Sequence, residues 1–221
     1  FVSGRVQLEA STFHGGEPDE NRWNIDTGKP DSFSSRLTIA ARDGIIGQFS
    51  IGRINNREPS EPGLDTLRTT ASIHHMVRFA WGHIASSLIW GRNKDMHEGE
   101  NRIFNAYTAE STLNFLKTNW GWVRIENVDR DRTLLVGETT EALETEGDPI
   151  GRVQAYTFGY ERDLPVKLSR VKVGVGVQAT AYGLTQQLKP VYGNHPAGFS
   201  VFLHIRPSSN IGEHMQIMHR H

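Results

Sequence analysis

The fold of this chain is decided by the stretch Val171-Lys172-Val173-Gly174-Val175-Gly176-Val177-Gln178-Ala179-Thr180-Ala181, in which apolar residues alternate with polar or very small ones. A β-strand places successive side chains on opposite faces, so the alternation gives one apolar face and one polar face. Strands of soluble globular proteins usually have about 5–6 residues, whereas a tilted strand that crosses a membrane needs about 9–11. The stretch therefore predicts a long amphipathic strand.

The same period of two recurs along the chain, while helical periodicity is nearly absent. The pattern predicts ten strands, over Val2–Ser11, Phe33–Ala41, Gln48–Gly52, Leu67–Phe79, Ile84–Trp90, Ala106–Phe115, Trp122–Glu126, Ala155–Tyr160, Val171–Ala181 and Phe199–Arg206. Beyond the last strand, residues 208–221 lose all periodicity and are expected to form a flexible tail.

Long and short connections between these strands alternate. The long ones are His14–Asp31, Asn55–Asp65, Gly91–Arg102, Asp129–Arg152 and Gly183–Pro196. The short ones are Arg42–Gly44, Ala80–His83, Thr118–Gly121 and Glu161–Pro165. Short turns at one end and longer loops at the other are typical of up-and-down barrels of the outer membrane, whereas a soluble sandwich with Greek-key connections has no reason to alternate so regularly.

The composition excludes several classes of protein. The chain has 221 residues, no Cys, and 24 Lys and Arg residues against 25 Asp and Glu residues. It therefore has no disulfide framework, Cys nucleophile or Cys-based zinc site, and its balanced charge argues against a general nucleic-acid binder. A mean hydropathy of −0.48 is still compatible with a membrane barrel, because every second strand residue faces a polar interior.

Two internal segments and the last strand carry a family resemblance. The segments Gly52-Arg53-Ile54-Asn55-Asn56-Arg57-Glu58 and Trp90-Gly91-Arg92-Asn93-Lys94 resemble uncharacterised β-barrel proteins of the Gram-negative outer membrane. The strand Gly198–Ile205 resembles the C-terminal signal that barrel-assembly machinery reads, although a tail follows it here. Together with the strand lengths and the alternating connections, the resemblance predicts a ten-stranded antiparallel up-and-down transmembrane β-barrel over residues 1–207, either complete or the C-terminal part of a longer barrel. It also implies localisation in the outer membrane, contact with lipid and lipopolysaccharide, and other envelope proteins as partners.

Charged residues dominate the face opposite the apolar one. By parity this face receives Arg5, Glu9, Arg36, Arg68, His74, Arg78, Glu110, Arg124, Glu126, Arg170, Lys172, His204 and Arg206. In a narrow barrel such charges pair with one another and fill the lumen. Alternatively, an Arg-rich lining forms a porin-like pore with a preference for anions. The sequence leaves a channel and a scaffold subunit open.

Other candidate sites are weaker. The tail contains imidazole and thioether side chains, which suit copper and similar soft metals, at His214, Met215, Met218, His219 and His221. Adjacent strand residues point to opposite faces, so His74 and His75 are not expected to chelate one metal together. No cofactor motif occurs, no cofactor is expected, and the chain is expected not to be an enzyme.

Two alternatives to a channel or scaffold remain. A soluble β-barrel that binds an apolar ligand would turn its apolar face inward. A hydrolase on the barrel rim would need a carboxylate–His or Ser–His group. The only loose candidates for such a group are His97 with Glu98 and Glu100, and His195 near Ser200.

Overall fold

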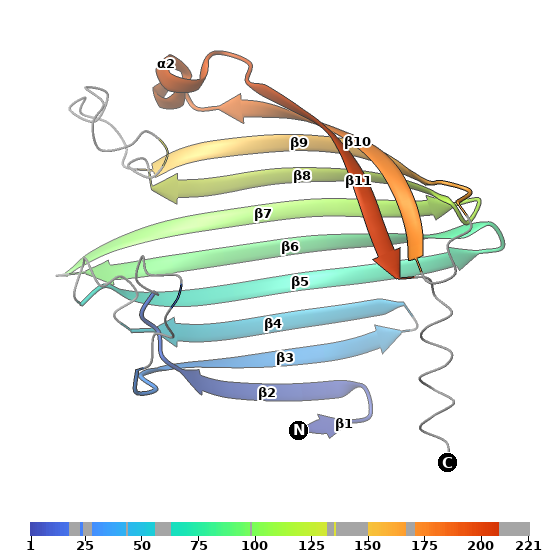
Figure 1. The fold of residues 1–221 in the computed structure, drawn as a ribbon. Coiled ribbons are helices and arrows are strands. Elements are labelled where there is room, and N and C mark those ends of the chain that lie inside the picture. The colour runs from blue at the N-terminus through green and yellow to red at the C-terminus, as the bar shows by residue number, and fades with distance from the viewer. Residues whose placement is uncertain are drawn as a thin grey trace.

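The computed structural model describes residues 1–17, 23, 28–42, 44–55, 63–97, 99–131, 135, 150–166 and 171–207. Within these ranges the chain forms one antiparallel sheet of eleven strands, each hydrogen-bonded to its neighbours in sequence (Figure 1). The strands are β1 (Val2–Ser3), β2 (Val6–Phe13), β3 (Ser32–Arg42), β4 (Ile45–Ile54), β5 (Asp65–Phe79), β6 (Gly82–His97), β7 (Glu100–Phe115), β8 (Asn119–Asp131), β9 (Ile150–Asp163), β10 (Val171–Leu184) and β11 (Ala197–Pro207). The prediction of an all-β, up-and-down antiparallel topology is confirmed.

The sheet is open, and its strand count differs from the prediction. No pairing within the described ranges joins β11 to β1 or β2. The prediction of ten strands is wrong by one, because the first predicted strand breaks at Gly4, where φ is 57°. The chain turns there, and the Leu8 amide donates to the Phe1 carbonyl at 2.8 Å, so Val2–Ser3 pairs back onto β2.

Several predicted connections are shorter than expected, because strands continue where the apolar alternation stops. The predicted long connection Gly91–Arg102 is wrong: β6 and β7 remain paired from Gly82↔Phe115 to His97↔Glu100. The extensions of both strands carry polar side chains on both faces, so the hydropathy pattern does not predict them as strands. Likewise β8 and β9 extend into the predicted connection Asp129–Arg152, and β9 runs on to Asp163.

Two short helical segments, η2 (Gln186–Leu188) and α2 (Lys189–Tyr192), lie between β10 and β11. Within the described ranges, no helix is both long and apolar enough to cross a membrane.

The two faces of the sheet differ in both chemistry and burial. The apolar face is the exposed one: Phe158 is 60% exposed, Leu88 62% and Val201 65%. Part of the polar face is covered: Thr157 and Glu161, on the same strand as Phe158, are only 8% and 6% exposed.

The C-terminal half of the sheet curls toward its polar face. Two strands separate β8 from β11, which places them about 14 Å apart in a flat sheet. Even so, the ring centroids of Trp122 on β8 and Phe202 on β11 are 6.0 Å apart. Figure 1 shows the same curvature, with β10 and β11 running at a steep angle to β3–β8.

Candidate functional site on the polar face of the sheet

The polar face consists of rows of side chains that face one another across neighbouring strands. One such row runs through His74, Ser87, Glu110, Arg124 and Thr157 on β5 to β9. Hydroxyl pairs link neighbouring strands within this face: Ser11 with Ser34 at 2.8 Å, Ser50 with Thr70 at 2.6 Å, and Thr157 with Thr180 at 2.9 Å. The face is therefore polar yet largely satisfied by its own hydrogen bonds.

The C-terminal ionic cluster, formed by Trp120, Glu161, Asp163, His204 and Arg206, contains two buried carboxylates of this face. The guanidinium of Arg206 donates to Glu161 Oε1 at 2.8 Å and also to Asp163 Oδ1. His204 Nδ1 lies 3.2 Å from both oxygens of Glu161. The guanidinium also lies 5.5 Å from the centroid of the Trp120 ring, a cation–π distance. Both carboxylates are therefore compensated by basic groups, as buried charges require.

Two glycines of β10 let this cluster form. Glu161 and Asp163 belong to β9, whereas His204 and Arg206 belong to β11, so the groups meet across the intervening strand. A Cβ on Gly174 would lie 2.4 Å from Glu161 Oε1, and a Cβ on Gly176 would lie 2.2 Å from the Phe202 ring. The absence of side chains at these positions is what allows the contacts between β9 and β11.

Sequence reasoning missed Glu161 and Asp163, because it assigned both to a connection. A signal was present: Thr157, Gly159, Glu161 and Asp163 keep the parity of the polar face after the aromatic alternation ends at Tyr160. The two predicted residues His204 and Arg206 do come together, but their charge is offset by these acids. The excess of basic groups on the polar face is accordingly smaller than predicted.

A second ionic group lies at the centre of the polar face. Arg124 Nη2 donates to Glu126 Oε1 at 2.8 Å, and Arg124 Nε lies 3.9 Å from Glu110 Oε2. These three predicted residues line a hollow of about 390 Å³ with Gln178 and Thr180. The Arg124 side chain is 48% exposed, so this group is accessible to water and to small solutes.

Three more of the predicted residues line another hollow, near the N-terminus. Glu9 on β2, Arg36 on β3 and Arg68 on β5 surround a volume of about 390 Å³ together with serines of β2 to β4. Arg36 and Glu9 face each other in register. The Nε of Arg68 donates to Asn93 Oδ1 at 3.0 Å.

The remaining predicted residues of the polar face are dispersed. Arg5 lies in the turn before β2 and donates to the Ala41 carbonyl at 2.9 Å. Each ring nitrogen of His74 lies 3.0 Å from a serine hydroxyl. Arg78 is exposed at the end of β5, and Lys172 is exposed opposite Arg206 in register. Arg170 lies outside the described residues.

The predicted metal ligands of the tail, His214, Met215, Met218, His219 and His221, also lie outside the described residues. Within the described ranges, no group of three or more His, Asp or Glu side chains could hold a metal ion.

The candidates for a rim hydrolase do not assemble into a hydrogen-bonded group among the described residues. His97 and Glu100 pair in register at the end of the β6–β7 hairpin, and Glu98 lies outside the described residues. His97 Nδ1 is buried without a hydrogen-bond partner.

Hydrogen bonds lower one carboxyl pKa at the end of the sheet where the long connections lie. The Ser32 hydroxyl and the Gly15 amide donate to Asp31 at 2.7 and 2.8 Å, and they lower the pKa of its carboxyl below the ordinary value of 3.8. His14 Nδ1, 3.2 Å from Asp31, acts in the same direction.

Comparison with models of protein families, with curated proteins and with solved structures finds no match for this chain.

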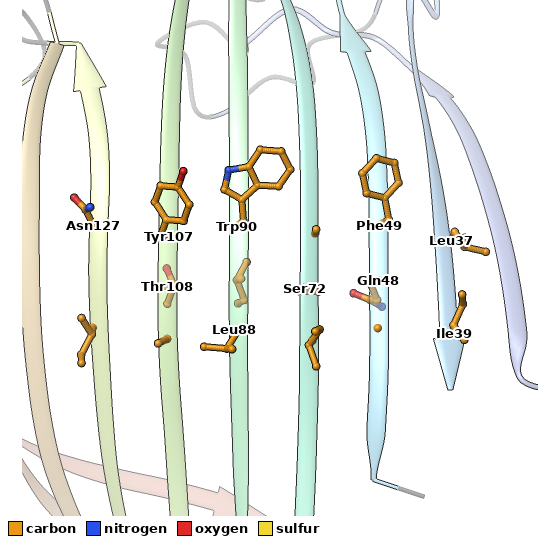
Figure 2. Close-up of a pocket in the computed structure, with 16 residues that line it drawn as sticks. Leu37, Ile39, Gln48, Phe49, Ser72, Leu88, Trp90, Tyr107, Thr108 and Asn127 are labelled. Atoms are coloured by element: carbon orange, nitrogen blue, oxygen red, sulfur yellow. The ribbon is translucent and has the colours of Figure 1, made fainter. Parts of the chain in front are cut away.

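The apolar face carries one small polar row at its centre, where His75, Ser86 and Ser111 face one another in register and the two serine hydroxyls lie 2.9 Å apart. A shallow hollow of about 630 Å³ lies on it, across β3 to β8. Figure 2 shows its side chains, which include Leu37, Ile39, Phe49, Leu88 and Trp90. The same residues form two adjacent rows across the sheet, one through Leu37, Phe49 and Trp90 and one through Ile39 and Leu88.

Proposed function

We propose that this sheet is the wall of an outer-membrane β-barrel, with its apolar face on lipid and its polar face lining the lumen of a porin-like channel. The observation that carries the proposal is the inverted burial of the two faces. Large apolar side chains such as Phe199 (72% exposed) and Leu203 (61%) stand outward, while carboxylates such as Glu161 (6%) are covered. In water, folding gains free energy by burying apolar surface, so an exposed apolar face is unfavourable there. In a bilayer the same face contacts lipid, which favours this arrangement.

The height of the apolar band supports this orientation. On β7 the band runs from Tyr107 to Phe115, which is nine residues and eight steps along the strand, and on β10 it runs from Val171 to Ala181, which is eleven residues and ten steps. At about 3.4 Å per residue these lengths are about 27 and 34 Å along the strands. A tilt of about 40° reduces them to about 21–26 Å, close to the band of about 25 Å in outer-membrane barrels.

Aromatic residues stand at both borders of the band. Trp90 and Tyr107 face each other in register, and the next row beyond them contains Arg92 and Asn105, whose backbone amide donates to Asp129 Oδ2 at 3.1 Å. The opposite border has Phe79 stacked on Trp81 at 5.0 Å, and Phe115 with its ring centroid 6.4 Å from that of Tyr160. Such aromatic rings suit the boundary between hydrocarbon and water.

The burial pattern favours this orientation over a soluble barrel with an apolar interior. In such a barrel the apolar face would be the enclosed one, whereas here large side chains of this face, such as Leu88 and Phe158, are exposed. The open sheet requires a closing contact between strands, because unpaired backbone groups are costly in hydrocarbon.

Two measurements test the proposal. The purified chain is folded into detergent micelles or lipid vesicles, and its migration in SDS gels is compared before and after boiling. We expect a compact band that shifts on boiling; a chain that stays monodisperse in water without detergent would contradict the membrane wall. Single-channel recording in planar bilayers under a salt gradient then tests the channel. An anion-selective reversal potential supports it, whereas folded protein without conductance leaves a scaffold subunit.

A further inference from the structure

We infer that the hollow between β2, β3, β4 and β5 on the polar face is a binding site for a tetrahedral oxyanion, such as free phosphate or the phosphate group of a small solute. The inference deepens the proposed function, because it assumes that the polar face is the water-filled side of the wall. It rests on the two arginines that line this hollow, Arg36 and Arg68.

Both guanidiniums lack a carboxylate partner among the described residues. Among the described residues, the arginines that do pair with a carboxylate are Arg53, Arg102, Arg124, Arg152 and Arg206. Within the part of the chain that the structure describes, Arg68 donates only to the neutral amide oxygen of Asn93, and Arg36 forms no side-chain hydrogen bond. Their positive charge is therefore available to a ligand, in contrast to that of Arg206 and Arg124 on the same face.

The register directs the two arginines at one place. Arg36 faces Ser50 on β4, and Arg68 faces Gly52, so the arginines lie on either side of β4 and one row apart. Standard sheet spacings place their Cα atoms about 12 Å apart. Gly52 has no side chain, and nothing in its row stands between Ser34 and Arg68. Two long side chains can thus converge over β4.

Hydroxyl groups complete the lining. The pair of Ser11 and Ser34 and the hydroxyl of Ser50 belong to the same hollow. Guanidinium groups bind phosphate-like oxygens in a bidentate manner, which adds geometric selectivity to charge attraction. Hydroxyls can donate to the remaining oxygens of a tetrahedral anion. A spherical chloride ion would use neither the fork geometry nor several hydroxyls at once.

One carboxylate opposes binding. Glu9 lines the hollow and faces Arg36 in register, but it forms no ion pair with Arg36. We expect it to weaken anion binding by about twofold, as a unit charge about 8 Å away through water would do.

The test measures phosphate binding by titration calorimetry. The full chain is folded in detergent micelles, in a phosphate-free buffer of low chloride. We expect inorganic phosphate to bind, and R36Q and R68Q each to weaken binding by about tenfold or more, since a hydrogen bond to a charged group is lost. E9Q should strengthen binding by about twofold. The matched control is R78Q, which removes an exposed arginine from the same face outside the hollow and should leave affinity unchanged.

Three results would overturn the inference: a folded chain that does not bind phosphate, an equal loss in R78Q, or equal competition by chloride. A further arm uses short-chain phosphatidic acid, and tighter binding of this lipid than of inorganic phosphate would assign the site to a headgroup instead of a free solute. The outcome is separable from the channel proposal. Gel migration and conductance test the membrane wall, whereas calorimetry reports the site in folded protein even if no channel opens.

Discussion

A single charge placed on the apolar face tests whether that face meets lipid. The substitution Leu88→Arg is informative because Leu88 is 62% exposed and lies within the band, one row from Trp90. In water, exchange of an exposed side chain changes the free energy of unfolding by no more than about 0.5 kcal/mol. At the midplane of a bilayer, arginine on the lipid face costs about 2–4 kcal/mol. Leu88 lies midway between the border row of Trp90 and the middle row of Ser86 and Ser111, so we expect a loss between the interface and midplane values, of about 1–3 kcal/mol.

The assay is reversible urea unfolding of the chain in lipid vesicles, followed by tryptophan fluorescence. A lower midpoint with an unchanged dependence on urea concentration identifies a loss of stability. The matched control is Asn101→Arg, which adds the same charge to an exposed position on the same face near the end of β7. Near the interface the cost is about 0–1 kcal/mol. If both variants unfold at the wild-type midpoint, the apolar face is not in lipid and the reasoning is refuted.

Three further predictions concern individual contacts. Glu161→Gln should lower the free energy of unfolding by about 2–4 kcal/mol, because it removes the buried carboxylate that Arg206 and His204 share. Glu126→Gln, at a more exposed ion pair, should cost less than about 1 kcal/mol; equal urea midpoints for the two variants would contradict the importance of burial. Gly176→Val should cost about 1–3 kcal/mol in the same assay, because its Cβ would meet the Phe202 ring at 2.2 Å and force a shift. The pKa of the Asp31 carboxyl is lowered in the folded chain, so its contribution to stability is present above pH 3.8 and is lost as pH falls through the folded pKa. The NMR shift of the Gly15 amide, which donates to this carboxylate, should therefore change only below pH 3.8. A change centred above that value would contradict the prediction.

The sequence predicts the centres of the strands well and their ends poorly. The centre of β10 is unambiguous, because Val171 to Ala181 alternates without a break, and its contrast between faces comes directly from the pleat. The ends of β6 and β7 escape prediction, because beyond Trp90 polar residues stand on both faces and the alternation that marks a strand disappears. Backbone hydrogen bonds between the strands hold this region in the sheet, and the hydropathy pattern does not depend on these bonds.

The sequence predicts the candidate site only in part, because it places residues on a face but does not show which of them are in contact. Parity places Arg36, Arg124 and Arg206 on one face, but it does not tell which of them has a carboxylate partner. That depends on register across two or more strands, as for Arg206 and Glu161, which meet only because β10 has Gly174 between them. The unpaired state of Arg36 and the paired state of Arg206 are therefore properties of the assembled sheet.

The open edge of the sheet has a consequence for how such a chain enters a bilayer. Within the described residues β11 is hydrogen-bonded only to β10, so alternate amides and carbonyls along Ala197–Pro207 point away from the sheet. Each such group would lose several kcal/mol of hydration in hydrocarbon if it had no partner. Insertion of this wall is accordingly coupled to formation of a seam, either with β2 of the same chain or with a strand of another molecule. The last strand would then be the place where assembly into the membrane is completed or arrested.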